Sequence, residues 1–262
     1  MATDKIYARN EGGVTWLILN QPEKRNAISL DMISHGIILL KEFASEKKAK
    51  VLVLAGEGKI AFCAGGDISE FDQMRSNSKD AIKYDREALK FFDLLYNIEK
   101  PTVAMVRGYC LGGGLGLAVS CDIRICSEDA QFAIPAARLG LGYDLELMER
   151  LIELVGPSYA KEMIYTAHRY NAVDALKMGL VNRVQPKSTL EQYVIDYTIN
   201  IAKNAPLSQK SAKIIVSELR QIPTERNMEK CKASIERCLN SEDYLNARKD
   251  FLEKREPKFI GE

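Results

Sequence analysis

The sequence predicts a mixed α/β fold whose C-terminal part is built from helices alone. Over the first two thirds of the chain, short apolar runs typical of strands alternate with segments in which apolar residues recur at helical spacing. Strands separated by helices imply parallel strands joined by crossovers. From about residue 145 one helical segment follows another. We therefore expect an α/β core followed by a helical region.

The expected elements follow from these patterns in chain order. The predicted strands are apolar runs that end at turn residues, and they cover residues 14–19, 51–55, 101–106 and 121–126. Apolar residues at helical spacing predict a helix over residues 30–44, with Ser29 as its N-cap, and a second helix over residues 80–98. The C-terminal helices are expected over residues 145–154, 158–166, 172–178, 189–204, 207–220 and 224–239.

Composition and charge narrow the class of protein. The 262 residues are 46% hydrophobic and 28% charged, as in an ordinary globular protein. Lys and Arg number 37 and Asp and Glu number 36, and this near balance argues against nucleic-acid binding through phosphate neutralisation. The first five residues lack the apolar part of a signal peptide, and no apolar run approaches the roughly 18–20 residues of a membrane span. We expect a cytoplasmic protein with no membrane partner.

The cysteines do not indicate a metal site. They lie at positions 63, 110, 121, 126, 231 and 238, form no C-x-x-C pair, and are accompanied by two histidines in the whole chain. A structural zinc site is therefore not expected, and no other metal is indicated. A chain of this length can bury about 70–75% of its unfolded surface, so its core needs neither disulfide nor metal. Cys110, Cys121 and Cys126 lie in apolar segments and are expected to be buried thiols.

Two glycine-rich segments each follow a predicted strand, at residues 62–68 and 108–118. Glycine lets a ligand approach main-chain N–H groups closely, and two such loops on neighbouring strands could converge on one oxygen. That arrangement is an oxyanion hole, in which each donor contributes roughly 3–4 kcal/mol to transition-state stabilisation. Neither segment fits the G-x-G-x-x-G or P-loop pattern, and no G-x-S-x-G elbow occurs. The alternative is that these glycines serve tight turns or close helix packing.

Taken together, the motifs resemble those of the crotonase superfamily, the enoyl-CoA hydratase/isomerase family. The matching stretches are NQPEKRNAI (20–28), FCAGGDI (62–68), KPTVA (100–104), GYCLGGG (108–114), CDI (121–123), QF (131–132), LG (139–140), ALKMGLV (175–181) and FLEKREPKF (251–259). They cover nearly the whole chain in order. The resemblance implies a spiral core of ββα turns over residues 1–200, which carries an acyl-CoA site. It also implies a helical region over residues 201–262 that assembles the chain as a homotrimer or a dimer of trimers.

The family's shared chemistry is an acyl-CoA thioester whose enolate is held by two backbone N–H groups, and the resemblance assigns these donors to Gly66 and Gly113. No separate cofactor is implied, because coenzyme A enters as part of the substrate. The resemblance also implies coenzyme A contacts in two places, at Lys24, Arg25 and Ala27 and at Ala64 and Ile68. A solvated turn is the alternative for Lys24 and Arg25. Asp67, which follows the first donor, is expected to be structural.

The match breaks where hydratases of this family carry two glutamates as general acid and base. Gly116, two residues after the triple glycine, stands at the first position, and Ala136 stands at the second. Neither side chain can move a proton, and one positioned acid or base contributes about 10²–10⁴ in rate. Standard two-glutamate hydration is therefore not implied by the resemblance.

The segment after residue 140 holds the residues that could replace them. Asp144 aligns with an aspartate used for proton abstraction in dienoyl-CoA isomerases. Tyr143 aligns with a pocket tyrosine of methylmalonyl-CoA decarboxylases, although these carry a histidine where this chain has Gly66. Arg138 is a third candidate, able to hold a carboxylate. Alternatively, Asp144 caps the following helix and Tyr143 is a wall residue.

Three functions remain open at this point. The first is an enoyl-CoA hydratase/isomerase-type enzyme, and the second is an enoyl- or dienoyl-CoA isomerase or acyl-CoA decarboxylase that needs no second glutamate. The third is a non-catalytic acyl-CoA-binding protein that keeps the donor loops without turnover.

Overall fold

The computed structural model describes residues 3–70 and 78–262. Its larger sheet has the strand order β1-β2-β3-β5-β7-β10. The strands are β1 (Ile6–Glu11), β2 (Val14–Leu19), β3 (Val51–Gly56), β5 (Thr102–Val106), β7 (Ile123–Ser127) and β10 (Arg183–Gln185). β1 and β2 form an antiparallel hairpin, and every later pairing in this sheet is parallel. The parallel order confirms the α/β class that the alternating pattern predicts.

A second, smaller sheet has the order β4-β6-β8-β9 and consists of strands of two or three residues. These are β4 (Ala61–Cys63), β6 (Tyr109–Leu111), β8 (Gln131–Ala133) and β9 (Tyr170–Asn171). β4, β6 and β8 pair in parallel, so the segments that follow them start from the same edge. Both glycine-rich loops therefore leave this sheet side by side.

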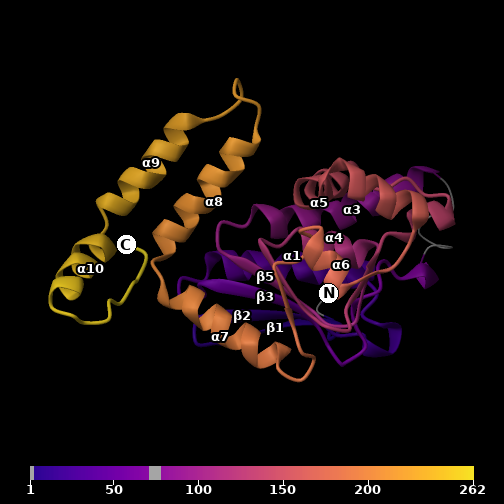
Figure 1. Cartoon of the computed structure of the whole chain (residues 1–262), viewed down its shortest axis with the longest axis horizontal. Coiled ribbons are helices and arrows are strands. Elements are labelled where there is room, and N and C mark those ends of the chain that lie inside the picture. Colours follow the sequence, from indigo (N-terminus) through magenta and orange to yellow (C-terminus); the bar gives the residue numbers. More distant parts are fainter. Residues whose placement is uncertain (1–2, 71–77) are drawn as a thin grey trace.

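Helices cover both faces of the larger sheet (Figure 1). One face carries α1 (Leu30–Ser45), α3 (Ser78–Asn97), α4 (Gly113–Val119), α5 (Leu145–Thr166) and α6 (Ala172–Lys177), and the other carries α7 (Leu190–Lys203). Because successive strand residues point to opposite faces, β2 divides its side chains between two apolar cores. Leu17 and Leu19 lie in the core under α1, whereas Trp16 and Ile18 lie in the core under α7. This double cover explains why every residue of β2 is buried.

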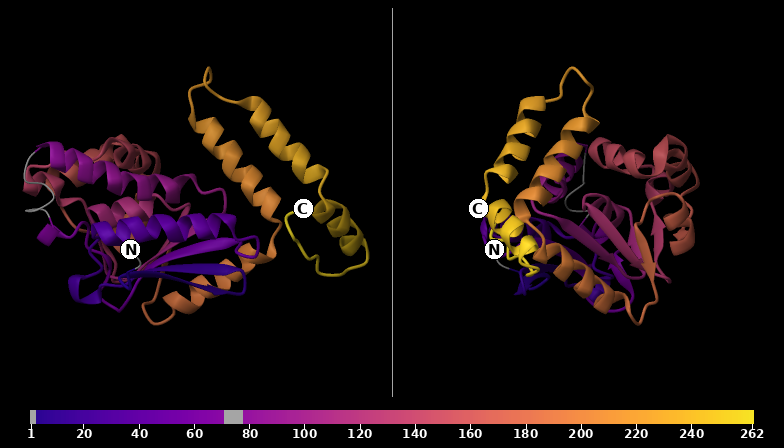
Figure 2. Two further views of the ribbon diagram at one scale, coloured as in Figure 1. Left: turned by 180° about the vertical axis from the view of Figure 1, so that it is seen from behind. Right: turned by 60° about the vertical axis from the view of Figure 1, so that its left-hand side comes forward.

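The last three helices, α8 (Pro206–Arg220), α9 (Met228–Leu239) and α10 (Glu242–Leu252), extend away from the sheet as an arm (Figures 1 and 2). Polar contacts tie the arm to the core, among them the ion pair of Lys213 Nζ with Asp122 at 2.9 Å. The arm leaves many large apolar side chains exposed, including Val216, Leu219, Ile235, Leu239, Leu245, Phe251 and Leu252.

β1 and α10 were not predicted, and the predicted helices and strands lie close to their expected bounds with the following differences. The segments 145–154 and 158–166 form one helix, α5, which is broken at Gly156 by a φ of +75°. The helix expected from residue 224 begins at Met228, and Ser29 is the N-cap of α1 without a capping hydrogen bond from its side chain. None of the helices in the described ranges combines the length and the apolar content that crossing a bilayer requires.

The buried Arg124 of β7 joins two chain segments through main-chain carbonyls. Its Nε donates to the oxygen of Leu180 at 2.7 Å and its Nη1 to the oxygen of Cys121 at 2.6 Å. We expect Arg124→Met to lower the free energy of unfolding by about 2–5 kcal/mol, because each buried acceptor left without a donor costs about 1–3 kcal/mol. Chemical denaturation measures the difference. Arg183→Met, at an exposed position of the neighbouring strand β10, is the control. Equal losses of unfolding free energy in the two variants would contradict the expectation.

Candidate active site

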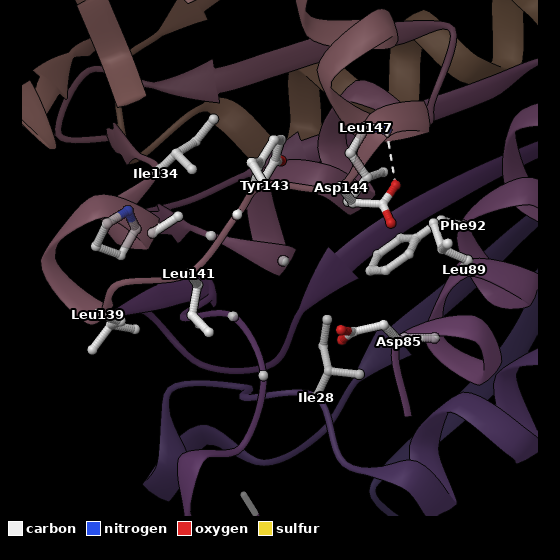
Figure 3. Close-up of a pocket in the computed structure, with 18 of the residues that line it drawn as sticks. Ile28, Asp85, Leu89, Phe92, Ile134, Leu139, Leu141, Tyr143, Asp144 and Leu147 are labelled. Atoms are coloured by element: carbon white, nitrogen blue, oxygen red, sulfur yellow. Dashed lines mark hydrogen bonds between the residues drawn. The ribbon is translucent and has the colours of Figure 1, made fainter. Parts of the chain in front are cut away.

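A cavity of about 500 Å³ opens between α3, α4, the 3₁₀ turn Pro135–Leu139, the start of α5 and the loop after β4 (Figure 3). Its wall is mostly apolar, with side chains that include Ile28, Leu89, Phe92, Ile134, Leu139, Leu141 and Leu147. The charged side chains of the described lining are those of Asp85 and Asp144. Apolar walls with a few polar groups are typical of small-molecule sites.

The first glycine loop is held in place by the chain segment that precedes α1. The amide of Ile28 donates to the oxygen of Gly65 at 2.7 Å, and the amide of Asp67 donates to the oxygen of Ile28 at 2.8 Å. These hydrogen bonds occupy the carbonyl oxygen of Gly65 and the amide of Asp67, the residues on either side of Gly66. Within the described ranges the Gly66 amide itself has no acceptor, and Gly66 lines the cavity. Its N–H group is therefore available to a ligand.

The second glycine loop turns from β6 into α4. Gly112 has a φ of +52°, which favours glycine, and its amide donates to the oxygen of Ala133 at 2.9 Å. Gly113 is the first residue of α4, where an amide has no partner within the helix. The Gly113 amide has no acceptor elsewhere in the described chain, and Gly113 also lines the cavity.

The structure brings the two loops into contact. A Cβ added to Gly113 would lie 3.7 Å from the amide nitrogen of Gly66, and one added to Gly65 would lie 3.4 Å from the amide nitrogen of Gly113. The closest approach is at Gly114, where a Cβ would lie 2.3 Å from the carbonyl oxygen of Cys63. Glycine at position 114 thus lets the loops meet. As a result, two amides that have no acceptor in the described part of the chain lie close together on the cavity wall.

Asp144 lines the same cavity as these amides and also caps α5. Its Oδ1 accepts from the amides of Glu146 at 3.1 Å and Leu147 at 3.3 Å, so capping uses one of its two carboxylate oxygens. Figure 3 shows the carboxylate at the start of the helix, above Phe92. Burial, with the nearby charge of Glu146, raises the pKa of Asp144 despite the two amide hydrogen bonds. The capping interpretation is confirmed, and it leaves the carboxylate on the cavity wall.

Tyr143 precedes Asp144 and lines the same cavity. Its hydroxyl is buried and has no hydrogen-bond partner within the described residues. Burial raises the pKa of Tyr143 further above its usual range, so the phenol is neutral. A buried hydroxyl without a partner is a donor that a ligand oxygen could satisfy.

The residues that the resemblance connects with coenzyme A lie in two groups. Ala64 and Ile68 line the cavity, whereas Lys24, Arg25 and Ala27 lie outside its lining. Lys24 Nζ contacts the buried Asp67 at 2.6 Å, which gives Asp67 the structural role expected of it. The Arg25 guanidinium lies over the ring of Tyr109 at 5.5 Å.

The two positions without glutamate have different surroundings. Ala136 lines the cavity, whereas Gly116 is buried in α4. A Cβ at Gly116 would lie 2.8 Å from Cδ1 of Leu147. Arg138 is exposed and lies outside the described lining.

Sequence reasoning did not single out Asp85 or Leu147. Asp85, Leu89 and Phe92 lie on one face of α3 and all line the cavity. Their i, i+4, i+7 spacing would have placed an acid on the apolar face of this helix. Leu147 carried no comparable signal, because its role depends on the packing of α5 against α4.

Comparison with known proteins identifies the family to which this fold belongs. The family model for enoyl-CoA hydratase/isomerase matches residues 9–262. The chain belongs to this family. The solved enoyl-CoA hydratase from Bacillus anthracis superposes with a TM-score of 0.94 at 30% identity, over 99% of this chain and 100% of that one. The spiral α/β fold of the crotonase superfamily is thereby confirmed.

Curated relatives carry more than one activity in their names. The short-chain-enoyl-CoA hydratase of Clostridium acetobutylicum is 33% identical over 255 residues, 97% of each chain. The mitochondrial Delta(3,5)-Delta(2,4)-dienoyl-CoA isomerase of Dictyostelium discoideum is 30% identical, over 98% of this chain and 92% of its own. Membership of this family therefore supports the view that the chain is an enzyme acting on acyl-CoA thioesters. The named hydratase and the named isomerase have similar sequence identity to this chain.

Proposed function

We propose that this enzyme moves a proton on an enoyl-CoA thioester and so shifts its double bond. The observation that carries the proposal is that the amides of Gly66 and Gly113, neither with an acceptor among the described residues, and the carboxylate of Asp144 line a single cavity. The two amides would hold the thioester oxygen as it becomes an enolate, where fixed donors in a dry site are most effective.

The reaction with a 3-enoyl-CoA needs one base. Asp144 takes a proton from C2, and the electron pair of the C–H bond moves into the thioester, leaving negative charge on the oxygen held by Gly66 and Gly113. The protonated Asp144 then returns the proton to C4. The double bond moves from C3–C4 to C2–C3, with no net gain or loss of atoms or electrons.

Two features favour isomerisation over the other candidates. The first is that Gly116 and Ala136 supply no acid or base for the addition of water. The second is the charge of the wall: Asp144 lies on it, and its described lining contains no cationic side chain. An acyl group that carries its own carboxylate would be buried beside the like charge of Asp144, which is costly. This disfavours decarboxylation of a malonyl-type thioester.

Coenzyme A would lie along the first glycine loop. Lys24 and Arg25 are exposed cations beside this loop and suit the phosphates, while the main chain at Ala64 and Ile68 suits the adenine. The exposed apolar side chains of α8, α9 and α10 suit contacts between subunits, and we propose a homotrimer or a dimer of trimers.

The proposal is tested with a panel of short and long 2-enoyl-CoA, 3-enoyl-CoA, dienoyl-CoA and methylmalonyl-CoA, followed by mass spectrometry. We expect conversion of 3-enoyl-CoA to 2-enoyl-CoA and no loss of CO₂ from methylmalonyl-CoA. Robust hydration of 2-enoyl-CoA without double-bond migration would contradict the proposal. Tight binding without any reaction would identify a binding protein instead.

The pH dependence gives a further test. We expect kcat/KM to fall as the pH is lowered through the pKa of Asp144, because the ionised carboxylate alone can take a proton. Burial raises this pKa, so the loss should begin at a higher pH than an ordinary aspartate would give. The acid limb of the pH profile with 3-enoyl-CoA measures it. An acid limb at or below the ordinary aspartate value would contradict the role of Asp144.

A further inference from the structure

The side chain of Leu147 lines the cavity and fills the space beside Gly116, which is buried in α4 outside the lining. A Cβ on Gly116 would lie 2.8 Å from Cδ1, 3.4 Å from Cδ2 and 3.7 Å from Cγ of Leu147. Carbon atoms pack at about 3.5–4.0 Å, so even a methyl group at position 116 does not fit unless Leu147 moves. Leu147 therefore occupies the space that a side chain at position 116 would need.

Neither of these two residues offers a polar group to the cavity. The Gly116 amide donates to the oxygen of Gly112 at 3.1 Å. The Gly116 oxygen accepts from the amide of Ser120 at 3.1 Å and from its hydroxyl at 2.8 Å. Both main-chain groups of Gly116 are thus used inside α4, and Leu147 contributes methyl groups. A buried water needs about two to four polar partners, and Gly116 and Leu147 supply none of them.

Leu147 also belongs to the turn that places Asp144. Its amide donates to Oδ1 of Asp144 at 3.3 Å, and its side chain is 5% exposed. One residue therefore both orients the carboxylate and covers the wall next to it.

We propose that Leu147 determines the reaction by keeping water away from the acyl group, so that proton transfer occurs without hydration. The inference rests on the proposed function. Hydration would form a bond between the water oxygen and C3, pass one water proton to a base, and place a proton on C2. Because the methyl groups of Leu147 offer that water no hydrogen bond, the dienolate takes back a proton from Asp144 instead.

The test measures how much substrate is hydrated relative to how much is isomerised. Wild type, Leu147→Ala and the control Leu145→Ala, which removes the same atoms from an exposed position of α5 outside the cavity lining, are each incubated with 3-enoyl-CoA and 2-enoyl-CoA in H₂¹⁸O. Mass spectrometry gives the ratio of ¹⁸O-labelled 3-hydroxyacyl-CoA to isomerised product. We expect Leu147→Ala to raise this ratio by roughly tenfold or more, and Leu145→Ala to leave it near the wild-type value.

A second pair of variants covers the case in which Leu147→Ala does not fold. Leu147→Thr and Leu147→Val have nearly the same shape, and the threonine alone brings a hydroxyl that can hold a water. The hydration ratio should be higher in Leu147→Thr than in Leu147→Val.

The outcomes separate the two proposals. Unchanged ratios in the Leu147 variants, with isomerisation intact in wild type, would overturn the role of Leu147 alone. Rapid hydration by wild type would also overturn it. Absence of double-bond migration in wild type would overturn the proposed function itself.

Discussion

Replacement of Asp144 by Asn is expected to lower turnover of 3-enoyl-CoA by about 10²–10⁴-fold, the contribution of one positioned acid or base. The amide of asparagine cannot take the C2 proton. Its side-chain oxygen can still cap α5, because Asn and Asp are equally good N-caps. The variant should therefore fold as wild type does and bind the thioester, while kcat falls.

Two controls separate catalysis from structure. Asp144→Ala removes the cap as well and should lower the free energy of unfolding by about 1 kcal/mol, as measured by chemical denaturation. Asp129→Asn removes a carboxylate that pairs with Lys187 at 2.5 Å on the surface, and turnover should stay at the wild-type level. Activity of Asp144→Asn within a few-fold of wild type would show that the carboxylate is only a helix cap.

Gly114→Ala is expected to damage both activity and stability. The new Cβ would lie 2.3 Å from the carbonyl oxygen and 2.8 Å from the Cβ of Cys63, so the clash involves main chain that cannot rotate away. The two glycine loops must separate, and the amides of Gly66 and Gly113 move apart with them. Loss of one oxyanion donor typically lowers kcat by about 10²–10³-fold, and overpacking costs about 1–3 kcal/mol.

Kinetics and denaturation together check this result. For stability, the matched control is Gly142→Ala, because a Cβ there meets no atom within 4 Å. Gly142→Ala should unfold at nearly the wild-type denaturant concentration, whereas Gly114→Ala should unfold earlier. A Gly114→Ala protein with wild-type kcat would show that the spacing of the two loops does not control the reaction.

The larger elements of the fold could be predicted from the sequence because their signals are local. β2 and β3 are continuous apolar runs, and α1 and α8 repeat apolar residues at helical spacing. The strands of the second sheet could not be predicted, since three residues such as Ala61–Cys63 show no periodicity. α10 was missed as well, because its first turn starts from a charged stretch with few apolar residues.

The active site likewise has features that the sequence predicts and features that it does not. Glycine composition predicted two loops near one another, and the structure brings Gly66 and Gly113 together. The contact of Gly114 with Cys63 and that of Gly116 with Leu147 join residues from different elements. Such pairs have no signal in a single chain, because they arise when the helices pack. Asp85 differs from these pairs, because its helical spacing with Leu89 and Phe92 was visible in the sequence.

The most direct test of Asp144 as the base follows the hydrogen at C2. 3-Enoyl-CoA carrying deuterium at C2 is incubated with wild type and with Asp144→Asn, and the label is located by mass spectrometry and NMR. We predict that wild type removes deuterium from C2, transfers it to C4 or releases it to solvent, and forms 2-enoyl-CoA, while Asp144→Asn leaves the label in place. Retention of all C2 deuterium by wild type that binds the thioester, or equal exchange in both proteins, would contradict enolate formation with Asp144 as the base.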